Sequence, residues 1–307
     1  MSDTPVLFLV FNRPSTTRLV FDQIKKAKPS KLFIAADAAR TEFPGEKELC
    51  EEVKRVVSEI DWPCDVYHLY QIQHLGCKTA VSLAITWFFD QVEEGIILED
   101  DCLPSLSFFS FCTAMLRQYR NEIGLFHING TNFQRGIQRG EGSYYYSKYT
   151  HVWGWATWRR AWSHYSLELK DWEVFKVSKE FENLSTAPGE KKFWINKFKK
   201  YHHHQEINNY WSWQWLYACW YNGGKTITPQ KNLVTNIGFG GGTNTIIVLN
   251  HLIIKSEELE PPYLNPREQS IDTEADAYTF SNIFKYKGPI LSRIKYHLNR
   301  IFYKRQP

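Results

Sequence analysis

Several features that often reveal a protein's function are missing from this sequence. Its six cysteines form no C-x-x-C pair, which argues against a zinc ribbon. No apolar run approaches the roughly 20 residues of a membrane-spanning helix, and no secretory signal opens the chain. The formal net charge of +4 is too small to indicate nucleic-acid binding by itself. We therefore expect a cytoplasmic protein with reduced thiols and no nucleic-acid partner.

The 307 residues suffice for one large α/β domain or two small ones, and aromatic residues make up an unusually large 16% of them. Apolar runs predict strands, and amphipathic or apolar segments between them predict helices. The expected strands are 5–11, 31–37, 65–71 and 95–101, and the expected helices are one after Pro14, 45–60, 77–92 and 104–120. Ser15 or Thr16 is the expected cap of the first helix. This alternation predicts a parallel sheet with helices on both faces.

Polar side chains follow three of these strands where each strand ends. Arg13 follows the first, Asp37 the second, and the run Glu99, Asp100 and Asp101 the fourth. In parallel sheets ligands bind beyond the carboxyl ends of the strands. Adjacent carboxylates repel one another unless a cation or hydrogen-bond donors hold them, and Mn²⁺ or Mg²⁺ prefers such oxygens. The pattern suits a nucleotide-sugar transferase, a nucleotidyltransferase or a response-regulator-like acid pocket.

The second half of the chain is less regular and rich in tryptophan. Segments 151–165 and 208–224 hold four tryptophans each, and 225–229 is an expected short strand. Aromatic faces stack on sugars, which favours the nucleotide-sugar transferase. The glycine-rich segment 232–245 does not lead from a strand into a helix, so it matches neither a dinucleotide-binding turn nor a P-loop.

Six sequence blocks then carry a family resemblance. In order they are VFNRP, IAADAAR, LGCKTAVSLAITWFF, GIILEDDCLPSLSFFSFC, HVWGWATWRRAW and WQWLYACWYNGGKTITPQKNLVTNIGFG, and they lie between about Pro5 and Thr245. The chain resembles GT-A-fold nucleotide-diphospho-sugar glycosyltransferases, more narrowly a bacterial group (haemolytic protein HlpA-like) related to N-acetylglucosaminyltransferase I.

The resemblance implies a GT-A (Rossmann-like) glycosyltransferase domain over 1–284, with a nucleotide-sugar half at about 1–130 and an acceptor half at about 131–250. It implies a UDP-sugar donor, a Mn²⁺ (or Mg²⁺) ion and inverting transfer to a glycan or lipid-linked glycan hydroxyl by direct displacement at the anomeric carbon.

The resemblance also implies roles for the residues at the strand ends. Arg13 would contact the nucleotide and Asp37 would hydrogen-bond the uracil ring. Glu99 would touch the donor sugar, Asp100 the ribose, and Asp101 would bind the metal directly.

Four further residues are candidates. His74 lies where the family approaches the nucleotide, and Lys78, from its charge at a helix start, is either a phosphate contact or a solvated helix residue. Trp153 and Trp155 either shape the acceptor side or pack in the core.

The acceptor side departs from the family pattern. Relatives usually carry the general base as an Asp in the segment written here as WSWQW, where this chain has Ser212. A serine hydroxyl cannot act as a base unaided, and the acids proposed in its place are Glu206 and Asp171. The loop after IGFG usually holds an acid and a histidine; here it reads Gly241, Gly242, Thr243, Asn244.

Two alternatives therefore stay open beside the transferase. One is a non-catalytic nucleotide-sugar or glycan-binding protein that has lost the base. The other is a nucleotidyltransferase, although the segment after the first strand, FNRPSTT, lacks the glycines of such enzymes.

The last segment, 285–307, holds seven basic residues and no acid, with apolar residues at helical spacing. Such a basic amphipathic helix either contacts an anionic membrane surface, at the inner face of the membrane, or docks on the domain.

Overall fold

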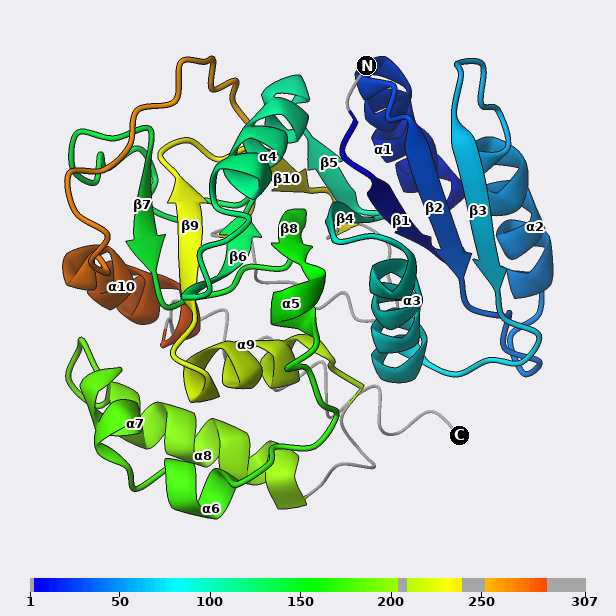
Figure 1. Cartoon of the computed structure of the whole chain (residues 1–307). Helices are drawn as coiled ribbons and strands as arrows, with labels where there is room; N and C mark the ends of the chain where they lie inside the picture. The colour runs from blue at the N-terminus through cyan, green and yellow to red at the C-terminus, as the bar shows by residue number, and fades with distance from the viewer. Residues whose placement is uncertain (1–2, 204–208, 239–251, 286–307) are drawn as a thin grey trace, which may run out of the picture.

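The computed structural model describes residues 3–203, 209–238 and 252–285 (Figure 1). An eight-stranded sheet has the order β3-β2-β1-β4-β8-β6-β9-β7. Its strands are β1 (Val6–Val10), β2 (Lys31–Ala36), β3 (Asp65–Tyr70), β4 (Glu94–Glu99), β6 (Leu125–Asn129), β7 (Tyr144–Ser147), β8 (Trp155–Trp158) and β9 (Lys225–Pro229). A separate two-stranded ribbon pairs β5 (Cys102–Pro104) with β10 (Val234–Asn236).

The helices surround this sheet. They are α1 (Pro14–Ala27), α2 (Glu46–Val57), α3 (Cys77–Gln91), α4 (Leu106–Gln118), α5 (Arg159–Trp162), α6 (Trp172–Phe175), α7 (Lys179–Asn183), α8 (Glu190–His203), α9 (Ser212–Tyr221) and α10 (Thr273–Thr279), followed by a π-helical turn, η2 (Phe280–Phe284). The predicted α/β class, a mostly parallel sheet flanked by helices, is confirmed.

The first four strands are parallel, as predicted, and lie in the order β3-β2-β1-β4. The sheet then changes direction, because β8 pairs antiparallel with both β4 and β6. β8 was not predicted from the sequence, because it has only four residues and a tryptophan at each end. β7 is the second antiparallel element and pairs with β9 at the sheet edge.

Helices cover both faces of the sheet. Val6, Phe8 and Val10 of β1 belong to one hydrophobic core, to which α1, α2 and α4 contribute. Leu7 and Leu9 belong to a second core, which includes side chains of α3, α5 and α9. Because side chains alternate across a strand, these two cores lie on opposite faces. A strand covered on both faces should be a continuous apolar run, and β1 is one.

The tryptophan-rich half forms a third core away from the sheet. Trp172, Trp194 and Trp220 pack there with Phe280 of η2. Figure 1 shows α6, α7 and α8 on the far side of α9 from the sheet. Most of the aromatic excess therefore fills cores.

The expected cap of the first helix was wrong. The helix begins at Pro14, and Arg13 is the cap residue. Proline suits the first helical position because its missing N–H would have no intrahelical partner there. Thr16 and Thr17 donate their hydroxyl hydrogens back to the Arg13 carbonyl oxygen, so Arg13 is held at the end of β1.

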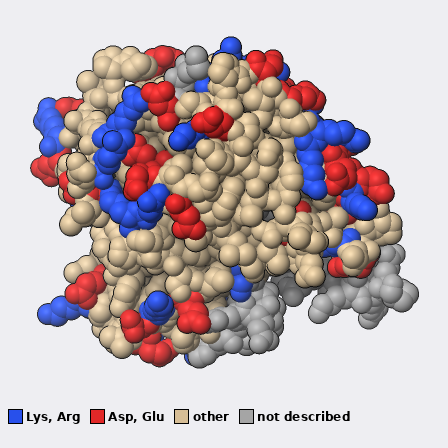
Figure 2. Space-filling view, turned by 45° about the vertical axis from the view of Figure 1, so that its right-hand side comes forward, with Lys and Arg blue, Asp and Glu red and all other residues tan. Residues whose placement is uncertain are grey.

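On the face in Figure 2, basic and acidic side chains lie next to one another in groups at either side, and a broad area without charged side chains lies between these groups. All six cysteines are free thiols. Among the described residues, no helix has the length and apolar character that crossing a bilayer requires. The segment 286–307, Glu206 and the loop residues Gly241, Gly242, Thr243 and Asn244 lie outside the described residues.

Candidate functional site

A pocket of about 480 Å³ lies at the carboxyl ends of β1, β2 and β4, between the start of α3 and the start of α9. It brings together most of the residues that the sequence analysis selected. These are Arg13, Asp37, His74, Glu99, Asp100, Asp101, Trp153 and Ser212. Lys78, Trp155 and Asp171 are not among its lining residues.

Two of the three adjacent carboxylates, those of Asp100 and Asp101, are held by an arginine and a backbone donor. The Nη1 atom of Arg13 lies 2.8 Å from Oδ2 of Asp101 and 3.6 Å from Oδ1 of Asp100. The backbone N–H of Phe11 donates to Oδ2 of Asp100 at 3.1 Å. These contacts join the end of β1 to the end of β4, which are neighbouring parallel strands.

One guanidinium does not balance the charge at this edge. Burial raises the pKa of Glu99 to about 8 and that of Asp100 to about 7, and the charge of Asp101 adds to both shifts. Arg13 acts in the opposite direction on both groups. A site that raises carboxylate pKa values in this way favours the arrival of a further positive charge.

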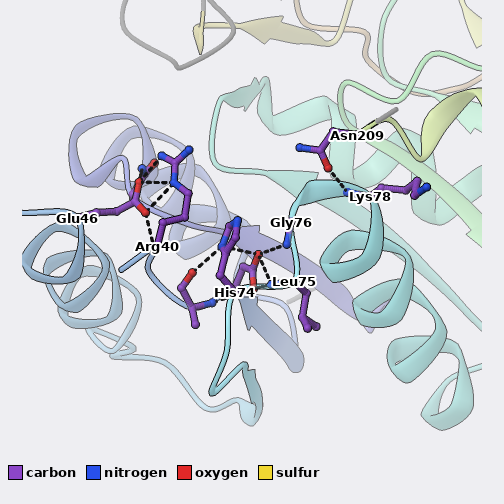
Figure 3. Close-up of polar contacts among 10 residues, drawn as sticks. Arg40, Glu46, His74, Leu75, Gly76, Lys78 and Asn209 are labelled. Carbon is purple, nitrogen blue, oxygen red and sulfur yellow. Dashed lines mark hydrogen bonds and ion pairs between the residues drawn. The ribbon is translucent and has the colours of Figure 1, made fainter. Parts of the chain in front are cut away.

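Asp37 organises the loop that follows β3. Its Oδ1 accepts the backbone N–H groups of Ala38 and Leu75, each at 2.9 Å, and its Oδ2 accepts the N–H of Gly76 at 2.9 Å. Figure 3 shows His74, Leu75 and Gly76 converging on these contacts. The carboxylate therefore ties the loop to the end of β2, a role that the sequence did not reveal.

His74 completes this arrangement. Its Nδ1 lies 2.8 Å from the carbonyl oxygen of Ala38 and 3.0 Å from Oδ2 of Asp37. A carbonyl oxygen only accepts, so Nδ1 carries the proton in this contact. The histidine ring is thereby fixed at the pocket wall.

Arg40 is a pocket residue that the sequence analysis missed. Its guanidinium lies 3.7 Å from the centroid of the Phe43 ring, and its Nε donates to Oε2 of Glu46 at 2.9 Å. Asn12 also donates to Glu46, at 2.7 Å. The hydrogen bond from Arg40 lowers the pKa of Glu46 to about 2. The position of Arg40, three residues after Asp37 in the IAADAAR block, was the available signal.

Asn209 was also missed, and it links the two walls of the pocket. Gly76, the cap residue of α3, has no side chain to accept from the helix N-terminus. Instead Oδ1 of Asn209 accepts the backbone N–H of Lys78 at 3.1 Å (Figure 3). A residue just before α9 thus caps α3, which no local sequence pattern indicates.

The two candidate tryptophans have different positions. Trp153 lines the pocket, whereas Trp155 is fully buried in the core. The Trp155 ring stacks on that of Trp211 with centroids 5.8 Å apart, and Trp211 itself lines the pocket. Trp155 therefore supports the pocket wall from beneath and offers no surface to a ligand.

Ser212 lies at the pocket wall, but Asp171 lies elsewhere. Asp171 faces a second hollow on another side of α9, where its Oδ2 accepts the hydroxyl of Tyr221 at 2.9 Å. In the chain the helices α6 to α8 separate Asp171 from Ser212, and in the fold Asp171 does not line the main pocket.

The residues at Asp101 fit a hard cation that is shared with a phosphate. A Cβ atom on Gly238 would lie 2.3 Å from Oδ2 of Asp101, so the backbone passes directly over this carboxylate. Within the described ranges, no group of three or more His, Cys, Asp or Glu side chains is arranged to hold a metal ion. Mg²⁺ and similar ions are commonly held by one or two carboxylates together with substrate phosphates, and a single carboxylate here matches that pattern.

Comparison with known proteins identifies no family. No protein-family model matches the chain, and neither does any curated protein. Solved structures with a partly similar backbone include apo UDP-glucose pyrophosphorylase (11% identity, 76% of this chain and 93% of that chain, TM-score 0.37). Mouse xyloside xylosyltransferase 1 is another (10% identity, 71% and 81%, TM-score 0.35). HddC from Yersinia pseudotuberculosis matches at 10% identity over 37% of this chain and about half, 54%, of its own length, with a TM-score of 0.27.

Proposed function

We propose that this protein is a metal-dependent glycosyltransferase that moves a sugar from a UDP-sugar to a hydroxyl of a glycan or lipid-linked glycan, with inversion. The observation that carries the proposal is the convergence of Arg13, Asp37 and the Glu99–Asp101 run on one pocket at the carboxyl edge of the sheet. Its volume of about 480 Å³ lies in the range of sites for cofactor-sized ligands.

In this proposal the donor is held by side chains from neighbouring strands. Asp101 is the protein ligand of a Mn²⁺ or Mg²⁺ ion, which when bound neutralises charge on the departing diphosphate. Arg13, now paired with Asp101 and Asp100, is the side chain that meets the diphosphate. Asp100 contacts a ribose hydroxyl and Glu99 a hydroxyl of the donor sugar. The charge of a bound metal ion would oppose the raised pKa values of both groups and favour their ionised, acceptor form.

The nucleobase is held through Asp37. Its carboxylate already accepts three backbone N–H groups, so we expect it to fix the loop at His74 to Gly76 as well as to contact uracil. UDP is therefore the expected nucleotide.

The acceptor hydroxyl needs a base on the other side of the pocket. Ser212 lines that side, and Glu206 is the remaining acidic candidate near it in sequence. The second candidate function, a binding protein without transfer, is favoured by this serine.

The decisive experiment incubates the protein with a panel of UDP-sugars, an acceptor glycan mixture and Mn²⁺, and measures UDP release with and without a chelator. Release that needs the metal and is lost in Asp101→Asn supports the proposal. Calorimetry that gives equal UDP affinity with and without metal refutes the assignment of Asp101. UDP binding without release by wild type and by Ser212→Asp favours the binding protein.

We further propose that the basic segment after Phe284 brings the protein to an anionic membrane surface. Its seven basic side chains, none balanced by an acid, support this.

A further inference from the structure

A second hollow, of about 220 Å³, lies beside α9, outside the main pocket. One side of it is the segment 163–171, and the other is a face of α9 and the residue after it. Its lining includes Tyr165, Asp171, Gln214, Tyr217 and Tyr221.

Gln214 lines this hollow and carries a polar atom that is shielded from solvent. The side chain is only 5% exposed, and among the described residues its Oε1 atom has no hydrogen-bond partner. A carboxamide has two donor hydrogens and an oxygen with two acceptor positions. Buried polar atoms in folded proteins are nearly always paired, so one that is not requires a reason, and a bound partner is one.

Asp171 is the second group. Its backbone is left-handed, with φ of 54°, and it directly precedes α6 without capping that helix through its side chain. The carboxylate instead accepts the Tyr221 hydroxyl through Oδ2.

An aromatic pair borders the same hollow. The rings of Tyr217 and Tyr221 are stacked, with centroids 5.8 Å apart and an angle of 20° between their planes. Tyr221 is 41% exposed and therefore presents an apolar ring surface next to the Asp171 carboxylate. An acceptor-only carboxylate, a carboxamide that both donates and accepts, and an aromatic face together suit an uncharged ring with many hydroxyl groups.

The hollow and the main pocket are lined by different residues of the same helix, α9. Trp211 and Ser212, at the start of this helix, line the main pocket, and Gln214 to Tyr221 line the hollow. With a rise of about 1.5 Å per residue, Tyr221 lies about 13 Å from Ser212 along the helix. The Tyr165 hydroxyl donates to the Trp211 carbonyl oxygen at 3.3 Å, which fixes the wall between the two sites.

We propose that this hollow is a saccharide-binding subsite, which holds one sugar ring of the acceptor glycan while another ring of the same chain reaches the main pocket. The placement of another ring in the main pocket rests on the proposed glycosyltransferase function, whereas the binding of a neutral saccharide ring in the hollow does not.

The test is saccharide binding by the full-length protein, measured by saturation-transfer NMR with chitotriose, cellotriose and maltotriose. We expect at least one of them to bind to wild type. Gln214→Leu keeps a similar volume but removes the carboxamide, and it should weaken that binding at least tenfold. Because it also removes an unpaired buried oxygen, its melting temperature should be equal to or above that of wild type. Asp171→Asn should weaken binding similarly, whereas Asp90→Asn, an exposed position on α3 outside both sites, should not.

The outcomes separate this inference from the proposed function, because UDP binding with Mn²⁺ is measured on the same samples. Failure of all three saccharides to bind, or binding that survives both Gln214→Leu and Asp171→Asn, overturns the subsite even if UDP binds. Saccharide binding that both changes abolish, without any UDP binding, establishes the subsite and refutes the proposed reaction.

Discussion

Replacement of Gly238 by alanine tests whether the position of Asp101 matters for the donor. The added Cβ would lie 2.3 Å from Oδ2 of Asp101 and 2.9 Å from its Cβ and Cγ atoms, closer than any normal contact. The local backbone is fixed by two hydrogen bonds. The Ile237 N–H donates to the Asp101 carbonyl oxygen at 2.8 Å, and the Gly238 N–H donates to Oδ1 of Asn236 at 2.9 Å. Relief of the clash must therefore displace the Asp101 side chain.

The size of the effect follows from the usual cost of inserting a methyl group into filled space, about 1–3 kcal/mol. If that cost falls on the bound state, UDP affinity in the presence of Mn²⁺ decreases by about 5- to 150-fold. UDP affinity in the presence of a chelator should change little, because the metal contact is what Asp101 contributes.

Calorimetric titration of UDP with Mn²⁺ and with chelator measures both quantities. The matched control is Gly124→Ala, where the new Cβ would meet nothing closer than Oε1 of Glu122 at 3.6 Å. The control should bind UDP as wild type does. Equal metal-dependent affinity of Gly238→Ala and Gly124→Ala would show that Asp101 does not hold the ion, or that the backbone over it yields without cost.

Four further predictions concern separate parts of the molecule. Asp37→Ala should weaken UDP binding by about 1–3 kcal/mol and speed amide hydrogen exchange at Leu75. Unchanged exchange at Leu75 would contradict the role of Asp37 in fixing the loop. In the wild type, UDP should outcompete GDP and ADP. Asn209→Ala should lower the free energy of unfolding by about 1 kcal/mol, the usual value of a helix cap, which chemical denaturation measures; no change would mean that water replaces the cap. If no other base acts, Ser212→Asp should raise the transfer rate by up to about 10²–10⁴-fold, with little change in UDP affinity. A neutral or harmful effect would point to Glu206 as the base, and Glu206→Gln should then lower the transfer rate. Deletion of the residues after Phe284 should abolish binding to anionic liposomes, with UDP binding unchanged; unfolding of the truncated protein would instead mean that the segment docks on the domain.

The nucleotide half of the fold could be predicted because each of its elements is indicated by residues that are adjacent in the sequence. β1, β2 and β4 are largely apolar runs, and polar side chains lie at or just after the carboxyl end of each of them, at the same edge of the sheet. Parallel pairing then placed Arg13, Asp37 and Asp101 together without knowledge of any contact.

The rest depends on contacts between distant segments. Asn209 caps a helix whose first residue is Cys77, and only the folded chain brings the two together. The aromatic excess suggested sugar stacking, yet Trp155 is buried, since composition does not distinguish a core tryptophan from one at a surface. Asp171 precedes Ser212 by 41 residues and faces a different hollow, because no local pattern shows which pocket so distant a side chain reaches.

The β5–β10 ribbon has a consequence for how the protein is made. Residues Cys102–Pro104 pair with Val234–Asn236, so the backbone over Asp101 comes from a segment about 130 residues later in the chain. During synthesis at about 5–20 residues per second, the four parallel strands emerge on the order of ten seconds before that partner. The carboxylates can thus be brought together in a partly synthesised chain in which the backbone at Gly238 does not yet pass over Asp101. A ribosome-bound chain that ends before Val234 should therefore leave Asp101 more open to solvent than the finished protein does.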